Sequence, residues 1–384
     1  MRVGGTMLSR RCSHILGLAL CSSLAGCAAP DPATPPPLGK DALAAVTADA
    51  GAPRKDLARA IDIVFTDPAV GETRAVVVMA NGKLAAERYA PGYGPDTRFI
   101  SWSMAKTITA TMIGLLVADG RLTLDEPAPI ARWQRPGDPR SAITIRHLLQ
   151  MRAGLDHTEA GPVPNESSEV RMLFLDGRDD MAQWAEEQPL EADPGSRFEY
   201  SSNTTVILAD IAARVLTDDS RDPETRRRAV SDYLEARLFE PLGMTSMVPE
   251  FDAAGTLIGG SLMHATARDY ARFGEFLRNK GSHRGAQLLP RQWVEAMVTP
   301  SPKSPQYGFQ TWLNRPVPER LGTSPLFPTR APHSLFAMIG HMGQYVLVSP
   351  EQRLTVVRLG HSDAAQRDAL MPRLAEVTKL YPAR

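Results

Sequence analysis

Ser103-Met104-Ala105-Lys106 is the most informative stretch of this sequence. It opens an apolar run at helical spacing that we expect to end at Gly120, a residue suited to a helix C-terminus. Residues three apart share one face of a helix, so the lysine amine can reach the serine hydroxyl and take its proton. A chain of this length holds on the order of one such tetrapeptide by chance, and the common alternative is a capping serine before a surface lysine.

Two later segments could complete a reactive site around Ser103. Tyr200 follows a Pro-Gly turn and precedes a helical pattern, which places it in a loop that could border a cleft. His341 stands between Gly340 and Met342-Gly343 at the predicted start of a strand, where glycines permit close approach of a substrate. The ordinary alternatives are a packing tyrosine and a turn histidine.

The first 26 residues are typical of a secretory signal. Arg2, Arg10 and Arg11 precede a short apolar run, and Leu24-Ala25-Gly26-Cys27 follows it. The run is too short to cross a bilayer as a helix. This ending resembles that of a bacterial lipoprotein signal, which implies that Cys27 is lipidated and becomes the first residue of the mature chain. The alternative is a plain signal peptide with a nearby cysteine.

Cysteine and charge content fit an exported, anchored protein. All three cysteines, Cys12, Cys21 and Cys27, lie in the first 27 residues, so the rest of the chain can form no disulfide. Without the three arginines of the signal, 40 basic residues face 43 acidic ones, a balance that does not favour a nucleic-acid partner. Residues 27–54 begin with a stretch rich in proline and alanine, and we expect them to form a semi-extended tether.

Residues 55–384 should form one large domain with an antiparallel sheet split in sequence. An apolar helical pattern over 54–65 precedes two strand-like runs, 75–80 and 83–89, joined by Asn81-Gly82, a pair typical of a type I′ hairpin turn. Helical spacing dominates from about 104 to 250, with helices expected over 145–151, 181–187, 205–215 and 230–238. Strands return at 335–339, 344–348 and 354–359, and a helix beginning at Pro372 closes the chain. The fold class is therefore α/β (α+β), with a helical subdomain inserted between two parts of the sheet and a site in the cleft between them.

Taken in order, Ser103-x-x-Lys106, Tyr200-x-Ser202 and His341-x-Gly343 resemble the three motifs of the serine β-lactamase and penicillin-binding superfamily. A tyrosine in the second motif points to its class C-like branch, which includes DD-peptidases, esterases and nylon-oligomer hydrolases. Intervening phrases match as well, among them the segments at 143–155, 241–244, 267–274 and 307–312. The resemblance covers about residues 55–384.

The resemblance implies a role for each motif residue. Ser103 would be the acylated nucleophile, with Lys106 and Tyr200 as its proton-transfer partners; which of the two is the base stays open. The backbone N–H groups of Ser103 and of Gln344, which follows Gly343, would form the oxyanion hole. If Lys106 is buried, loss of hydration should lower its pKa and let it act as a base near neutral pH.

Two departures from the family pattern bear on the substrate. Class C β-lactamases carry Tyr-x-Asn, where this chain has Ser202, and a lysine where it has His341, which is only partly cationic at neutral pH. Both changes are closer to the subgroup of 6-aminohexanoate-dimer hydrolases and esterases. We therefore expect a serine hydrolase that cleaves an ester or amide in a small or short peptide-like substrate.

Two other functions stay open: a β-lactamase or DD-peptidase acting on β-lactams or cell-wall peptides, and a non-catalytic envelope sensor. No cofactor is expected, and no metal, because no His-Glu-x-x-His pattern occurs and no cysteine is available as a ligand outside the signal. We expect the protein in a bacterial cell envelope, on the periplasmic face and lipid-anchored, with the outer membrane favoured because Ala28, not an aspartate, follows Cys27. The oligomeric state is open.

Overall fold

The computed structural model describes residues 37–318 and 323–384, and Leu38 to Arg384 form one compact unit. The predicted signal segment, the lipidation site Cys27 and the first part of the predicted tether lie outside the described residues. Within the described ranges, no helix is both long enough and apolar enough to cross a membrane.

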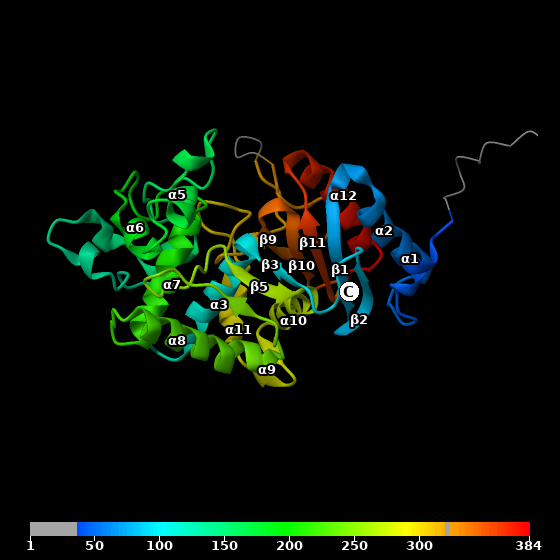
Figure 1. Ribbon diagram of the computed structural model, residues 1–384, viewed down its shortest axis with the longest axis horizontal. Helices are drawn as coiled ribbons and strands as arrows, with labels where there is room; N and C mark the ends of the chain where they lie inside the picture. Colours follow the sequence, from blue (N-terminus) through cyan, green and yellow to red (C-terminus); the bar gives the residue numbers. More distant parts are fainter. Residues whose placement is uncertain (1–36, 319–322) are drawn as a thin grey trace, which may run out of the picture. The chain divides into compact units, whose positions relative to one another are not determined.

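A six-stranded antiparallel sheet is built from the two ends of this unit (Figure 1). Its order is β2-β1-β11-β10-β9-β8, so the first hairpin pairs with the last strand of the chain. The strands are β1 (Glu72–Ala80), β2 (Lys83–Tyr89), β8 (Trp312–Leu313), β9 (Phe336–Gly340), β10 (Gln344–Ser349) and β11 (Leu354–His361). This arrangement confirms the predicted split sheet.

The β1–β2 hairpin turns at Asn81-Gly82 as predicted. Both residues have positive φ, 52° and 79°, which a type I′ turn requires. Successive residues of β1 then point to opposite faces: Val77 enters one hydrophobic core, while Val76 and Val78 enter the other. The sheet is therefore buried on both sides.

Helices cover the two faces of the sheet (Figure 1). On one side α2 (Arg54–Thr66) and α12 (Ala364–Lys379) pack together, and on the other α10 (Ala267–Arg278) contacts β1, β10 and β11. The prediction that the last helix begins at Pro372 was wrong. The helix begins at Ala364, because Asp363 and Gln366 form a capping box there, and Pro372 lies inside it.

The predicted helical subdomain is present between the two parts of the sheet. Its central helix, α3, is buried over twelve consecutive residues from Ala105 to Leu116, as expected for a helix surrounded by protein. The helices of this part are α3 (Ala105–Ala118), α4 (Ile145–Leu149), α5 (Ser168–Phe174), α6 (Met181–Glu187), α7 (Ser202–Leu216), α8 (Pro223–Leu234) and α9 (Glu240–Leu242). The remaining elements are α11 (Arg291–Met297), the hairpin β6 (Ser282–His283) and β7 (Ala286–Gln287), and a small sheet of β3 (Arg98–Ile100), β4 (Val248–Pro249) and β5 (Met263–Thr266).

The predicted tether is shorter than its composition indicated. Residues from Leu38 onward belong to the folded unit, where they form α1 (Lys40–Ala44) and then pair with β2. The Thr47 N–H donates to the Ala85 carbonyl at 2.9 Å, and Val46 is 2% exposed. An edge strand offers unpaired backbone groups, and this segment satisfies them on β2. Extension of the tether to residue 54 was therefore wrong.

Candidate active site

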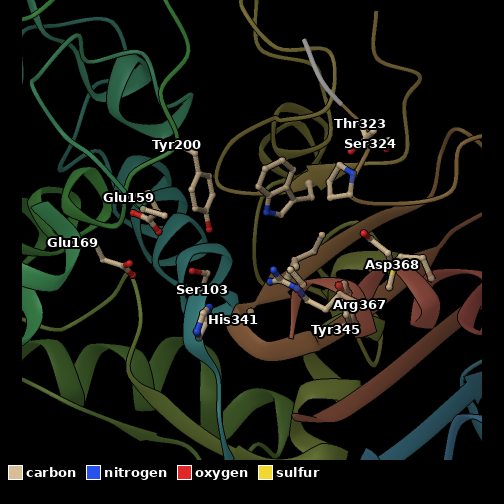
Figure 2. Close-up of a pocket in the computed structure, with 17 residues that line it drawn as sticks. Ser103, Glu159, Glu169, Tyr200, Thr323, Ser324, His341, Tyr345, Arg367 and Asp368 are labelled. Carbon is tan, nitrogen blue, oxygen red and sulfur yellow. The ribbon is translucent and has the colours of Figure 1, made fainter. Parts of the chain in front are cut away.

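Ser103 lies in a sharp turn that leads into α3. It is the middle residue of a short 3₁₀ turn, Trp102–Met104, and Trp102 has a φ of 44°. Positive φ is uncommon in a bulky residue and marks local backbone strain, which clusters at functional sites. The Trp102 ring is held edge-on by His341, with ring centroids 5.4 Å apart. The turn presents the Ser103 hydroxyl to a cavity (Figure 2).

Lys106 is buried beneath Ser103, and its amine lies within hydrogen-bond distance of three oxygen atoms. Its Nζ lies 2.9 Å from Ser103 Oγ, 2.7 Å from Ser202 Oγ and 2.9 Å from the Gly260 carbonyl oxygen. A protonated lysine has three donors, so this set matches an ammonium group. Glycine at position 260 lets its backbone lie close to that of Ser202, since a Cβ there would stand 2.8 Å from the Ser202 carbonyl oxygen.

Tyr200 occupies the loop just before α7, as predicted, and its hydroxyl points toward Ser103 (Figure 2). The ring packs on Trp312 and Tyr307, and Lys106 Nζ lies 4.8 Å from its centroid. Burial raises the Tyr200 pKa; the Lys106 charge and hydrogen bonding to Ser103 and Lys106 oppose that rise without cancelling it. The phenol is therefore the resting form near neutral pH.

Two glutamates that sequence reasoning missed lie beside this group. Glu159 accepts hydrogen bonds from the Ser202 hydroxyl (2.7 Å) and backbone N–H (2.5 Å), and lies 3.6 Å from Lys106 Nζ. Glu169 Oε1 lies 3.2 Å from Ser202 Oγ. Burial, with the nearby charge of Glu159, raises the Glu169 pKa to about 7. No spacing pattern links these residues to Ser202, which follows them by 43 and 33 positions.

The expectation of a lowered Lys106 pKa was wrong. Burial does disfavour the charged amine, but attraction from the ionised form of Tyr200 and from the carboxylates of Glu159 and Glu169 outweighs that loss of hydration. The Lys106 pKa therefore lies above its ordinary value. At neutral pH the residue is an ammonium ion.

His341 borders the cavity, in a 3₁₀ turn (His341–Gly343) between β9 and β10 and not in a strand. Partial burial lowers the His341 pKa, and the charges of Arg367 and His361 lower it further. The imidazole is thus mainly neutral at neutral pH. It is a weaker anchor for a carboxylate than the lysine of the family pattern.

Gly343 and Gln344 are buried and are not among the residues that line the cavity. The Gln344 amide bonds to both backbone groups of Gly360 in β11, at 2.7 and 3.0 Å. Arg358, fully buried, donates to the Gly343 carbonyl at 2.8 Å. A Cβ on Gly343 would lie 2.7 Å from that guanidinium, and its φ of 82° also favours glycine. The turn after His341 is therefore firmly held.

The cavity has a volume of about 430 Å³, and charged side chains line it on both sides (Figure 2). Ser103, Tyr200, Glu159 and Glu169 come from the helical subdomain, and His341, Arg367 and Asp368 come from the β9–β10 turn and α12. Apolar contact area is added by Trp312, Ile339, Tyr345 and Met371. In the part of the chain that the structure describes, no three His, Cys, Asp or Glu side chains form a group that could hold a metal ion.

Comparison with known proteins assigns this chain to one family. The model of the β-lactamase family matches residues 71–379, and the chain belongs to that family. Among curated relatives, a 6-aminohexanoate-dimer hydrolase of Paenarthrobacter ureafaciens is 28% identical over 283 residues, which cover 70% of this chain and 64% of that protein. Esterase EstB of Burkholderia gladioli is 30% identical over 212 residues, covering 49% of this chain and 50% of the esterase. The chain thus spans less than two thirds of either relative.

Solved structures show the same fold. EstCE1, a hydrolase with promiscuous acyltransferase activity, superposes with a TM-score of 0.62 at 18% identity, covering 85% of this chain and 99% of EstCE1. A penicillin-binding protein homologue from Caulobacter crescentus gives a TM-score of 0.60 at 17% identity over 87% of this chain and 97% of that one. At these identities the likeness extends to the fold alone.

Proposed function

We propose that this protein is a serine hydrolase that cleaves an ester or amide bond through an acyl-enzyme on Ser103. The observation that carries the proposal is the 2.9 Å contact between Lys106 Nζ and Ser103 Oγ at the floor of a cavity that Tyr200 also lines. A nucleophile within reach of proton-transfer partners is the arrangement that acyl transfer requires.

In the first step, Ser103 Oγ attacks the carbonyl carbon and its proton passes to the Tyr200–Lys106 pair. The C–O or C–N bond then breaks, and the leaving group takes that proton. Water repeats the sequence on the acyl-enzyme and releases the acid. The backbone N–H of Ser103, in the first turn before α3, and that of Gln344 are the proposed oxyanion donors, assigned by family resemblance.

The proposed substrate class is a small ester or amide, with kinship to 6-aminohexanoate-dimer hydrolases and esterases. Support comes from the two curated relatives, one an amide hydrolase by name and one an esterase. Ser202 adds support, because its hydroxyl is occupied by Lys106 and Glu159 and is not free to hold a substrate amide as the asparagine of class C β-lactamases does.

A fluorophosphonate probe tests the serine mechanism. The wild-type protein should be labelled at Ser103 and should cleave a p-nitrophenyl ester, and Ser103→Ala should abolish both. Equal labelling of Ser103→Ala and the wild type would rule out Ser103 as the nucleophile. A penicillin assayed beside the ester separates the β-lactamase and DD-peptidase alternative, which rapid penicillin turnover without ester cleavage would favour. Labelling without any turnover would favour an acylated sensor.

We further propose that residues 1–26 are removed and that a lipid on Cys27 anchors the protein in the cell envelope. The supporting observations are the arginine-rich start, the short apolar run and the position of Cys27 directly after Gly26. Growth with an alkyne fatty acid should label the wild-type chain and leave it in the membrane fraction. Cys27→Ala should be unlabelled and released; labelling of that variant would contradict the proposal.

A further inference from the structure

One hydroxyl in the site, that of Ser202, lies between two carboxyl groups and one amine. Ser202 Oγ is 2.7 Å from Glu159 Oε1, 3.2 Å from Glu169 Oε1 and 2.7 Å from Lys106 Nζ. Ser202 itself is 0% exposed, so water does not compete for these contacts. The mechanism proposed above uses neither carboxyl group.

Counting protons shows that the two carboxyl groups are not equivalent. A serine hydroxyl has one proton to donate and can accept two hydrogen bonds. Lys106 supplies one of the accepted bonds, and the hydroxyl donates to Glu159, the nearer carboxylate. The remaining contact with Glu169 is a hydrogen bond only if Glu169 carries a proton and donates it. The geometry thus requires about one proton for the carboxyl pair.

The charges around the pair favour the same state. Ionised together, two carboxylates on one hydroxyl repel each other in a buried site, and one of them binds a proton. Burial and the charge of Glu159 also raise the Glu169 pKa to about 7. The titratable groups that face the pair come from α3, from the loop before α7 and from the sheet side: Lys106, Glu199, Tyr200, Tyr307 and His341.

We propose that Glu159 and Glu169 are positioning residues that share one proton, hold the Ser202 hydroxyl, and thereby keep Lys106 an ammonium ion beside Ser103. The inference rests on the serine hydrolase function proposed above and goes beyond it. Lys106 then keeps all three of its protons, and the proton of Ser103 goes to the phenolate form of Tyr200. That proton later leaves with the alkoxide or amine, so the cycle returns Tyr200 to phenolate and Lys106 unchanged.

The proposal predicts a distinctive pH profile. The rate should rise with pH as the small phenolate fraction of Tyr200 grows, and fall where Lys106 loses its proton. The negative charge of Glu159 raises the pKa of both Tyr200 and Lys106. Removing that charge should therefore move both limbs of the profile to lower pH, an effect that a purely structural role would not produce.

Glu159→Gln is the main test, with an ester as substrate. We expect kcat to fall about 10- to 100-fold at the wild-type optimum with KM changed less than about threefold, and both limbs of the kcat/KM profile to move down in pH. Glu169→Gln, whose amide can still donate to Ser202, should remove any inflection of the profile near pH 7. Glu166→Gln, an exposed residue of the same segment, is the matched control and should change nothing.

A second measurement detects the shared proton directly. The difference between the infrared spectra of the wild-type protein and of folded Glu169→Gln should show a protonated carboxyl band that titrates away near neutral pH. Ser202→Ala should reproduce the kinetic loss of Glu159→Gln, and the double variant should lose little more, because both act through one hydroxyl.

Unmoved pH limbs in a folded Glu159→Gln, or a loss confined to KM, would overturn the inference. The latter result would mean that the carboxylates bind substrate. Absence of the titrating carboxyl band would also overturn it. In all these cases Ser103→Ala would still abolish turnover, whereas failure of the hydrolase proposal would appear as activity that survives Ser103→Ala.

Discussion

The Nζ of Lys106 lies 2.7 Å from the Oγ of Ser202, a residue 96 positions further along the chain. This contact joins α3, which begins directly after the turn that carries Ser103, to the first residue of α7. It also explains why the site keeps a buried cation. Ser202 accepts a hydrogen bond from Lys106 and donates one to the Glu159 carboxylate, and so links the amine to that negative charge. Hydrogen bonds to three acceptors hold the Lys106 amine in one position.

Lys106→Met should reduce kcat/KM by about 10²–10³-fold, the cost of removing a preorganised charged donor beside the reacting oxygen. Lys106→Arg should not restore activity, because a planar guanidinium cannot meet three acceptors arranged around one nitrogen. Ester hydrolysis with circular dichroism as a folding check measures both. Activity of Lys106→Arg within threefold of wild type would show that only the charge matters.

His157 should make the protein less stable in acid. The side chain is 3% exposed, and burial lowers its pKa from 6.5 to about 4. Between pH 6.5 and about 4, His157 binds a proton in the unfolded chain but not in the folded chain. The free energy of unfolding therefore decreases as the pH is lowered through this range. At 1.36 kcal/mol per pH unit this is about 3 kcal/mol.

His157→Gln removes this proton linkage. Urea unfolding of both proteins between pH 7 and 4 should show the wild type losing about 3 kcal/mol more than the variant. Parallel pH dependence of the two proteins would mean that His157 titrates normally in the folded state.

Local patterns allowed much of the fold to be predicted. Asn81-Gly82 set the first hairpin, because both positions need positive φ, and the strands at 336–361 alternate between two cores. The start of the last helix was missed, because the capping box at Asp363 outweighs the preference of Pro372 for a first turn. A residue preference thus predicts where a helix begins only if no stronger capping motif lies nearby.

The motif residues Ser103, Lys106 and Tyr200 do come together, as the ordered motifs indicated. Glu159 and Glu169 could not be found in this way, since neither has a spacing relation to Ser202 and only the fold of α5 and of the loop before it brings them to Ser202. The Lys106 pKa was wrong for the same reason. Burial was foreseeable from the sequence, but the carboxylates that reverse its effect were not.

A buried ionic network in the helical subdomain should dominate the stability of that part. Asp210 is 4% exposed in its side chain and accepts from both Arg214 and Arg226. Asp210→Ala leaves Arg226 without its carboxylate and Arg214 with Glu186 alone, which should cost about 3–5 kcal/mol. Glu224→Ala, which removes exposed ion pairs on α8, should cost less than about 0.5 kcal/mol. Urea unfolding tests both, and a loss below 1 kcal/mol for Asp210→Ala would contradict the assignment.

Arg367 is a cation in the sheet-side wall of the cavity, beside the carboxyl group of Asp368. Its side chain extends from α12 into the cavity (Figure 2), and its charge lowers the pKa of His341. Removing a nearby positive charge lowers the free energy of the protonated imidazole, so Arg367→Ala should raise the His341 pKa. An NMR titration of the ring protons would measure this pKa. Loss of a cation should also raise KM about fivefold for an ester that carries a carboxylate, with kcat unchanged.

Lys379→Ala is the matched control, a change on the same helix but outside the cavity lining. It should leave both the His341 titration and KM at wild-type values. A neutral ester gives a second comparison, because Arg367→Ala should leave its KM unchanged. Equal KM changes for charged and neutral esters would show that Arg367 shapes the cavity and does not recognise charge. An unchanged His341 pKa would show that solvent screens the guanidinium from the imidazole.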